Sequence, residues 1–150
     1  MPDINRMRVM AFHVDGERGF GAGERRLLDL AAVLGERGYG NMIVCREGDE
    51  LEREAKRLGF DTLGLPFLFD WDPVTAYLLK TASDVHGAIV HAHTDQAAGI
   101  AGLARHLGGA PWVAGDCIDL TAGAAEMGEA AARTYRRVLA PSYETAGNRS

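Results

Sequence analysis

The stretch Arg8-Val-Met-Ala-Phe-His-Val14, followed by Asp15-Gly-Glu-Arg-Gly-Phe-Gly-Ala-Gly-Glu24, decides the fold. Its first half is a short run of apolar and β-branched residues, which is typical of a strand buried on both faces. Its second half is a glycine-rich loop. Apolar residues then recur at helical spacing until Gly38 provides a C-terminal stop: Leu27, Leu30, Ala31 and Leu34. The order is therefore strand, loop and helix.

The same alternation continues along the chain. Further strands are predicted at 41–45, 62–65, 88–91, 112–114 and 137–140. Helices are predicted at 49–58, from Asp72-Pro73 to about residue 83, from 95 to 107 with Asp95 as the N-cap, and over 122–134. Strands separated by helices pair in parallel through right-handed crossovers. We therefore expect one α/β domain over residues 1–150, with a doubly wound, mainly parallel sheet and helices on both faces.

Composition excludes several classes of function. No apolar run approaches the ~20 residues needed to span a bilayer, and the amino terminus lacks the pattern of a secretion signal, so we expect a soluble, cytoplasmic protein. Cys45 and Cys117 are too few and too far apart for a Cys-x-x-Cys metal site, and we expect free thiols. The net charge of -5 gives nucleic acid no broad attraction, so no such partner is expected.

The glycine-rich loop is the first candidate site. Ligands of doubly wound sheets bind outside the carboxyl ends of the strands, where this loop lies. Its glycines allow close approach, and the helix that follows presents unpaired N–H groups to an anion or a sugar hydroxyl. Gly19-x-Gly21-x-Gly23 is not the dinucleotide fingerprint, and Cys45-Arg46 stands where an NAD site requires an acidic residue. A flexible loop without a ligand remains the alternative.

The second candidate is His91-Ala-His93-Thr94-Asp95. Residues i and i+2 of an extended segment share a face, so the two imidazoles could share a metal, but no third ligand lies nearby at a recognisable spacing. The other interpretation makes His91 a packed strand residue and places His93 over the crevice, with a near-neutral pKa suited to polar contact or proton transfer. We favour this second interpretation.

Two further segments have open assignments. Pro66-Phe-Leu-Phe-Asp-Trp-Asp72 gathers aromatic residues in a connection. They could form an acceptor wall or a membrane-facing patch, but we expect them to fold back onto the core. Asp116 and Asp119 follow the predicted strand 112–114, where a binding role and a solvated one are equally open.

Four segments together resemble the amino-terminal domain of GT-B glycosyltransferases of the group 1 (GT4-like) type. They are Met7–Asp15, Gly23-Glu-Arg25 at a helix start, Ala88–His93 and Val138-Leu-Ala-Pro-Ser142. The resemblance covers nearly the whole chain. It implies one Rossmann-like half of a two-domain enzyme, in which the amino-terminal half mainly holds the acceptor and the other half holds a nucleotide-sugar.

The resemblance also implies a retaining sugar transfer that needs no metal and no cofactor beyond the nucleotide-sugar substrate. Gly21, Ala22 and Gly23 would approach the donor phosphates or the acceptor, and His93 would touch the transferred sugar. The family's adjacent glycine pair is replaced here by Ala22-Gly23, with Gly21 added. Thr94 and Asp116 complete the expected substrate-binding residues.

The 150 residues resemble one half of such an enzyme, and the family's paired glutamates belong to the donor-binding half. Since groups on both sides of the reacting bond stabilise the transition state, we expect the chain alone to transfer no sugar at a useful rate. A lipid-linked acceptor would imply peripheral membrane contact. Two alternatives remain open: a stand-alone module of regulatory function that binds a nucleotide or a protein, and a small nucleotide-dependent enzyme complete in itself.

Overall fold

The computed structural model describes residues 9–115 and 123–147. Its strands are β1 (Met10–Asp15), β2 (Gly40–Arg46), β3 (Asp61–Leu65), β4 (Ile89–Ala92) and β5 (Trp112–Ala114). Its helices are α1 (Ala22–Glu36), α2 (Glu50–Arg57), α3 (Pro73–His86), α4 (Asp95–His106) and α5 (Ala124–Gly147). Strands and helices alternate along the chain, as the sequence predicts.

All strand pairs in the sheet are parallel, and the strand order is β3-β2-β1-β4-β5. The chain therefore builds the sheet outward from β1 in one direction and then crosses back to add β4 and β5 on the other side. The predicted α/β fold with a doubly wound sheet is confirmed. The strand order reverses between β1 and β4, which defines the switch point where ligands bind in such sheets.

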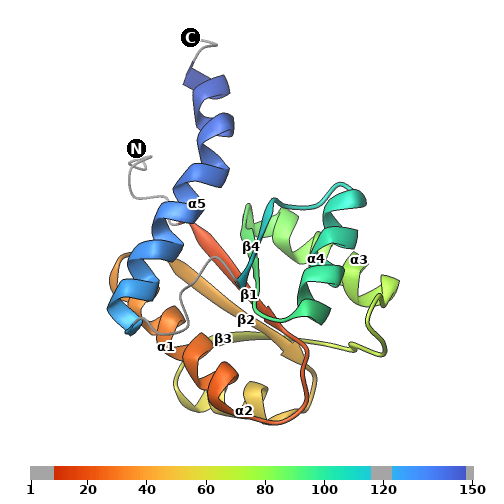
Figure 1. Ribbon diagram of the computed structural model, residues 1–150. Coiled ribbons are helices and arrows are strands. Elements are labelled where there is room, and N and C mark those ends of the chain that lie inside the picture. Colours follow the sequence, from red (N-terminus) through yellow and green to blue (C-terminus); the bar gives the residue numbers. More distant parts are fainter. Residues whose placement is uncertain (1–8, 116–122, 148–150) are drawn as a thin grey trace.

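Helices cover both faces of the sheet (Figure 1). On one face Phe12 and Val14 pack with residues of α3 and α4, including Leu79 and Ile100. On the other face Ala11 of β1 packs with residues of α1 and α5, and α2 packs beside α1. Because side chains alternate along a strand, His13 and Asp15 share the face of Ala11, under α1 and α5.

Local sequence signals explain most of the helix boundaries. Asp72 caps α3 as predicted: its carboxylate accepts hydrogen bonds from the Val74 and Leu68 N–H groups and from the Thr75 hydroxyl. Gly87 follows α3 with φ +58°, a left-handed conformation that glycine adopts without strain. One cap differs from the prediction. The N-cap of α4 is Thr94, whose hydroxyl accepts from the Ala97 N–H, and Asp95 is the first helical residue.

The predicted strand at 137–140 is wrong, because these residues belong to α5. The predicted helix at 122–134 therefore begins at Ala124 and continues to Gly147. The reason is tertiary packing: the apolar face made by Met127, Ala131 and Tyr135 continues at helical spacing into Val138 and Leu139, which pack on the same cluster. The β-branched Val138 and the following Pro141 suggested a strand and a stop, but burial of that helix face outweighs both signals.

The aromatic segment also departs from the expectation. Phe67 is fully buried, but Leu68, Phe69 and Trp71 are 71%, 55% and 75% exposed, so most of the segment does not fold back onto the core. Phe67 instead anchors the connection. Its backbone has φ +45°, and its carbonyl and that of Pro66 accept hydrogen bonds from Arg46. The apolar side chains beyond it face solvent.

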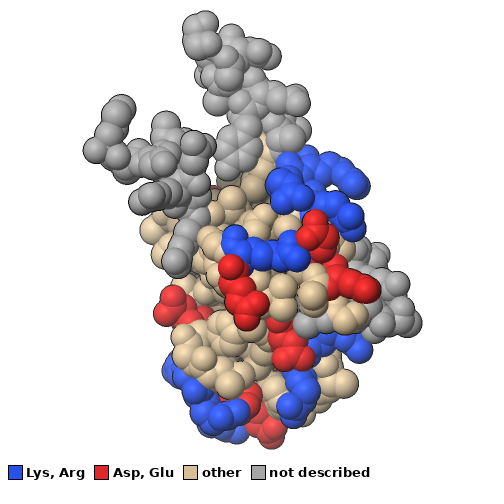
Figure 2. All heavy atoms as spheres, turned by 90° about the vertical axis from the view of Figure 1, so that its left-hand side faces the viewer, with Lys and Arg blue, Asp and Glu red and all other residues tan. Residues whose placement is uncertain are grey.

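Charges of both signs are interspersed on the face that carries α1 and α5 (Figure 2). One ion pair there joins the two helices, between Arg37 and Glu129. Cys45 is a buried free thiol, whereas Cys117, Asp116 and Asp119 lie outside the described residues. Within the described ranges, the helices are all too short or too polar to cross a membrane.

Candidate functional site

A cavity of about 140 Å³ opens at the switch point of the sheet. It lies at the carboxyl ends of the strands, between α1 and α5. Its lining comes from four places: Asp15 at the end of β1, His93 and Thr94 after β4, Gly115 after β5, and residues of α1 and α5, namely Gly23, Glu24, Arg26, Leu27, Leu30 and Met127. The topology therefore brings together Gly23, His93 and Thr94, three of the residues expected from the sequence.

Asp15 is a buried carboxyl in this cavity that sequence analysis did not select. Burial raises its pKa to about 7, and the neighbouring charges of Glu24 and Glu17 act in the same direction. A hydrogen bond from the Glu17 N–H to Asp15 Oδ1 (2.9 Å) partly opposes the shift. A carboxyl with a pKa near neutrality can accept or donate a hydrogen bond to a ligand, and it can exchange a proton at physiological pH.

The glycine-rich loop does not present all its N–H groups to a ligand. The Gly21 N–H donates to Glu24 Oε2 (3.0 Å), and the Gly19 N–H donates to Asp49 Oδ2 (2.9 Å). Two carboxylates thus occupy the positions that an anion would take. Gly21 and Ala22 line a second, open hollow beside Phe20 and Met127, and Gly23 alone of the three lines the switch-point cavity.

His93 is held at the switch point by its backbone and by its side chain. Its N–H donates to the carbonyl of Val14 on β1 (3.0 Å). Its ring Nε2 lies 3.0 Å from Nδ1 of His13. The residue is partly buried, and it lines the cavity. His93 therefore lies over the crevice, as the sequence analysis expected.

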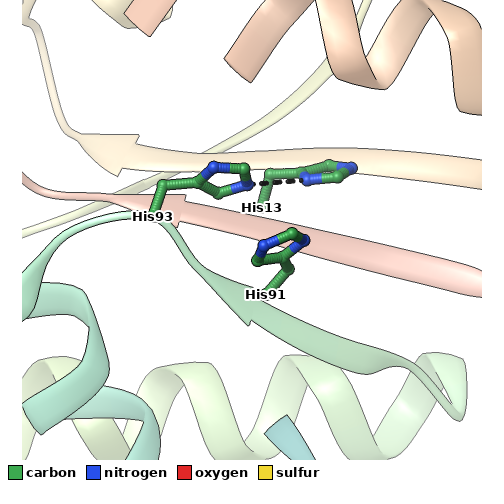
Figure 3. A group of neighbouring side chains, drawn as sticks. All are labelled: His13, His91 and His93. Carbon is green, nitrogen blue, oxygen red and sulfur yellow. Dashed lines mark hydrogen bonds between the residues drawn. The ribbon is translucent and has the colours of Figure 1, made fainter. Parts of the chain in front are cut away.

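Three imidazoles gather beside the cavity (Figure 3). His13 on β1 lies directly opposite His91 on β4 in the parallel register, and His93 follows two residues later. The rings of His91 and His93 are stacked, with centroids 4.1 Å apart. One ring nitrogen from each of the three residues lies within 4.8 Å of the others. The third imidazole that the sequence analysis did not find is supplied by His13.

Hydrogen bonds determine the tautomers of His13 and His93. Asn41 Nδ2 donates to the carbonyl of Ala31 (2.9 Å), so its Oδ1 is the atom that faces His13 Nε2 at 2.8 Å. His13 therefore carries its proton on Nε2 and accepts at Nδ1. The donor to that Nδ1 is the Nε2–H of His93, which leaves Nδ1 of His93 as a lone-pair nitrogen. A fixed chain of donors thus runs from His93 to α1.

His91 is fully buried between the sheet and α5. Its Nδ1 lies 2.6 Å from the hydroxyl of Tyr135. Its Nε2 is buried without a hydrogen-bond partner among the described residues. Such groups are rare in folded proteins because an unpaired polar atom costs free energy in the interior, so this nitrogen calls for an explanation.

All three imidazoles are neutral at physiological pH. Burial lowers the pKa of His13 to about 4 and that of His91 to about 3. Burial also lowers the pKa of His93 well below its usual value, and the two neighbouring histidines add to that effect. The near-neutral pKa expected for His93 is therefore wrong. It came from the assumption that a residue at a strand tip is well solvated, whereas His93 packs against two other rings.

Sequence reasoning missed His13, Asp15 and Asn41. One signal was available: His13 and Asp15 are polar residues that alternate with Phe12 and Val14 inside a run otherwise fit for burial. Alternation of this kind places both polar side chains on one face of the strand. Their partners could not be identified without the strand order, which sets β1 beside both β2 and β4.

Comparison with solved structures identifies the class of fold. A glycosyltransferase from Rickettsia africae matches 71% of this chain and 29% of its own, with 18% identity and a TM-score of 0.56. HepE from Anabaena, crystallised with UDP and glucose, covers the same shares with 15% identity and a TM-score of 0.56. MurG from Acinetobacter baumannii has 14% identity and a TM-score of 0.57, over 71% of this chain and 34% of its own.

The chain therefore has the Rossmann-like fold that occurs in GT-B glycosyltransferases, which confirms the expected resemblance at the level of the fold. It spans about a third or less of the length of these three structures. No family model matches the sequence, and no curated protein matches it.

Proposed function

We propose that this chain is the acceptor-binding half of a cytoplasmic, retaining glycosyltransferase that uses a nucleotide-sugar. The observation that carries the proposal is the cavity at the switch point, which is lined by Asp15, His93 and Thr94 in a fold shared with three glycosyltransferase structures. HepE was crystallised with UDP and glucose, which supports a nucleotide-sugar as the donor.

The chemistry of the cavity favours a ligand rich in hydroxyl groups. Asp15 and Glu24 supply carboxyl oxygens, and two N–H groups of the glycine-rich loop are already bonded to carboxylates. A donor phosphate would have to displace Glu24 and would meet like charge. Sugar hydroxyls, in contrast, can donate to these oxygens and to the lone pair of His93 Nδ1. We therefore assign the cavity to the acceptor side.

The apolar part of the cavity suits a sugar ring. Leu27, Leu30 and Met127 line it beside the polar groups, and pockets for small molecules combine an apolar wall with a few oriented polar atoms. In the assembled enzyme His93 would contact the transferred sugar near the reacting centre. The donor-binding domain would supply the groups on the opposite side of the reacting bond.

A first test is whether the gene encodes further sequence beyond residue 150. The proposal expects a second α/β domain with a Glu-x7-Glu pattern there. In the full-length protein, His93→Ala should lower the transfer rate by about 10²-fold or more, the typical contribution of one positioned polar group in a closed site. His106→Ala, at an exposed position in α4, is the matched control. Unchanged transfer by a folded His93→Ala protein would remove His93 from the site.

The exposed apolar segment supports a contact with a membrane that carries the acceptor. Leu68, Phe69 and Trp71 lie next to one another in sequence and face solvent. Aromatic side chains of this kind insert at the bilayer interface, and binding then depends on apolar area because the net charge of the chain is -5. Sedimentation with lipid vesicles should fall for Trp71→Ala, and equal sedimentation of both proteins would contradict the contact.

A further inference from the structure

The three histidines beside the cavity bring ring nitrogens close together, and one of these nitrogens has no hydrogen-bond partner among the described residues. We propose that His13, His91 and His93 bind one divalent transition-metal ion of the zinc type through three imidazole nitrogens. One ring nitrogen from each lies within 4.8 Å of the other two; His13 and His91 lie on the paired strands β1 and β4, and His93 directly follows β4 (Figure 3). The proposal does not rest on the function proposed above, although both involve the ring of His93.

Two of the rings already have the outer partners that a metal site requires. Histidine ligands donate their second ring N–H to a carbonyl, a carboxylate or another fixed oxygen, which sets the tautomer and the ring direction. Asn41 Oδ1 does this for Nε2 of His13, and the Tyr135 hydroxyl, 2.6 Å from Nδ1 of His91, can accept from that nitrogen in the same way. The nitrogens left over are His13 Nδ1 and His91 Nε2, which belong to neighbouring residues in the register.

The unpartnered nitrogen of His91 is the second line of support. When Nδ1 of His91 donates to Tyr135, Nε2 is left with a buried lone pair and no hydrogen-bond donor among the described residues. An ion that accepts this lone pair removes the cost of leaving it unpaired. His13 Nδ1 and His93 Nε2 lie only 3.0 Å apart, close to the ~3.3 Å that two nitrogens have when each is about 2.0 Å from the same tetrahedral zinc.

The donor set indicates the kind of ion. Three neutral imidazoles suit zinc, cobalt, nickel or copper, whereas magnesium and calcium require oxygen ligands. Asp15 lies two residues after His13 on the same face of β1, and it lines the cavity together with His93.

Metal binding requires one ring to turn. The rings of His91 and His93 are stacked with an interplanar angle of 20° and centroids 4.1 Å apart, so their nitrogen lone pairs lie in two nearly parallel planes and do not converge on one ion. His93 is the ring with room to move, since it is partly buried and lines the cavity. On binding, its proton shifts from Nε2 to Nδ1, and Nε2 becomes the third ligand. The stack with His91 is lost as a result.

The test is zinc binding by the purified chain, prepared without a histidine tag. After dialysis against Zn²⁺ and removal of free metal, we expect one ion per chain for the unsubstituted protein and for His106→Gln, the exposed control. His13→Gln should bind at least ~100-fold more weakly because a ligand is lost. Asn41→Leu should bind about 10- to 100-fold more weakly, as expected when an outer partner is removed. Binding by His13→Gln equal to that of the unsubstituted protein would overturn the proposal.

A second measurement requires no substitution in the core. Co²⁺ added to the unsubstituted protein should give the intense visible absorption of a four-coordinate site, with a bound water completing the three nitrogen ligands. X-ray absorption of the zinc form should show three imidazoles. No binding above that of the unfolded chain, or an ion held by fewer than three imidazoles, would overturn the proposal.

Discussion

At the scale of single residues, four titratable groups are desolvated at the switch point of the sheet, where the strand order reverses. His13, His91 and His93 are held neutral, and Asp15 is shifted toward its protonated form. Desolvation is the largest cause for all four. The histidines and the aspartate therefore respond to pH in opposite directions, and single substitutions can separate their contributions.

The first prediction concerns His13. Its pKa is lowered from 6.5 to about 4 in the folded protein, so between these pH values the unfolded chain binds a proton at His13 and the folded chain does not. This stability is present above pH 6.5 and is lost as the pH falls toward 4, with about 2 kcal/mol lost between pH 7 and pH 5. Urea unfolding gives the free energy of unfolding of the unsubstituted protein and of His13→Gln. The value for the unsubstituted protein, relative to that for His13→Gln, should fall by that amount between pH 7 and pH 5. A difference that does not change with pH would contradict the buried neutral state.

The second prediction concerns Asp15 and has the opposite sign. Its pKa is raised to about 7, so the folded state is destabilised as the pH rises from 3.8 through 7 and the buried carboxyl ionises. Asp15→Asn, which imitates the neutral form, should raise the free energy of unfolding at pH 8 by as much as about 4 kcal/mol and have little effect at pH 4. Asp29→Asn, at an exposed position in α1, is the control. Denaturant unfolding at the two pH values measures both variants.

The third prediction tests the hydrogen-bond chain that ends at Asn41. In the metal-free protein, nitrogen-15 spectra of the imidazoles should show protons on Nε2 of His13 and Nε2 of His93. Asn41→Leu removes the acceptor that selects the His13 tautomer, so the populations at both rings should become mixed. The spectrum of the exposed His106 should stay unchanged. A proton on Nδ1 of His13 in the unsubstituted protein would refute the assigned direction of the chain.

At the scale of elements, the connection between β3 and α3 separates two kinds of aromatic residue. Phe67 is fully buried and Trp71 is 75% exposed, four residues apart. Gly16 lies so close to Phe67 that a Cβ there would be 2.3 Å from the phenylalanine ring. The loops after β1 and β3 are therefore packed on one another through this side chain.

The fourth prediction follows from that contrast. Phe67→Ala should lower the free energy of unfolding by about 3–5 kcal/mol, because it opens a cavity under the loops. Trp71→Ala should change it by no more than about 0.5 kcal/mol. Thermal or denaturant unfolding measures the loss in free energy of unfolding for each of the two variants. Equal effects would mean that Trp71 is packed in solution.

Most elements could be predicted from local sequence. Runs such as Asn41–Cys45 and glycines such as Gly38 and Gly87 carry the strand and stop signals within a few residues. The prediction of a strand at 137–140 was wrong because the helix found there is stabilised by residues far away in the sequence. Tyr135, Val138 and Leu139 pack on the sheet and on α1. Local propensity is a weak guide where tertiary packing decides.

At the scale of the whole molecule, the strand order determines the site. His13 and His93 are 80 residues apart in sequence and become hydrogen-bonded neighbours only because β1 and β4 pair in the sheet. The sequence could predict that His93 and the glycine-rich loop reach the same edge. It could not predict which residue of β1 meets them, since that requires the register as well as the order.

The fifth prediction concerns the activity of the chain as a whole. If the chain is the acceptor-binding half proposed above, it lacks the groups on the other side of the breaking glycosidic bond, so the purified 150 residues should give no transfer above the rate without protein. The same chain should still show weak binding of a sugar acceptor, which Asp15→Asn should alter. Turnover by the purified chain would favour the alternative of a small enzyme complete in itself.

The position of α5 has a consequence for how the molecule could be taken apart. This last helix supplies Tyr135 to His91 and Met127 to the cavity, and Gly128 approaches Val33 of α1 so closely that a Cβ would lie 2.4 Å from its methyl group. These contacts allow α5 to pack on the rest of the domain in one position only. If the chain were divided between residues 115 and 123, the two pieces would have to reassociate in that single register. Return of the histidine rings to their buried environment would show that the two fragments have reassociated. The protein could therefore be developed as a two-fragment reassembly sensor.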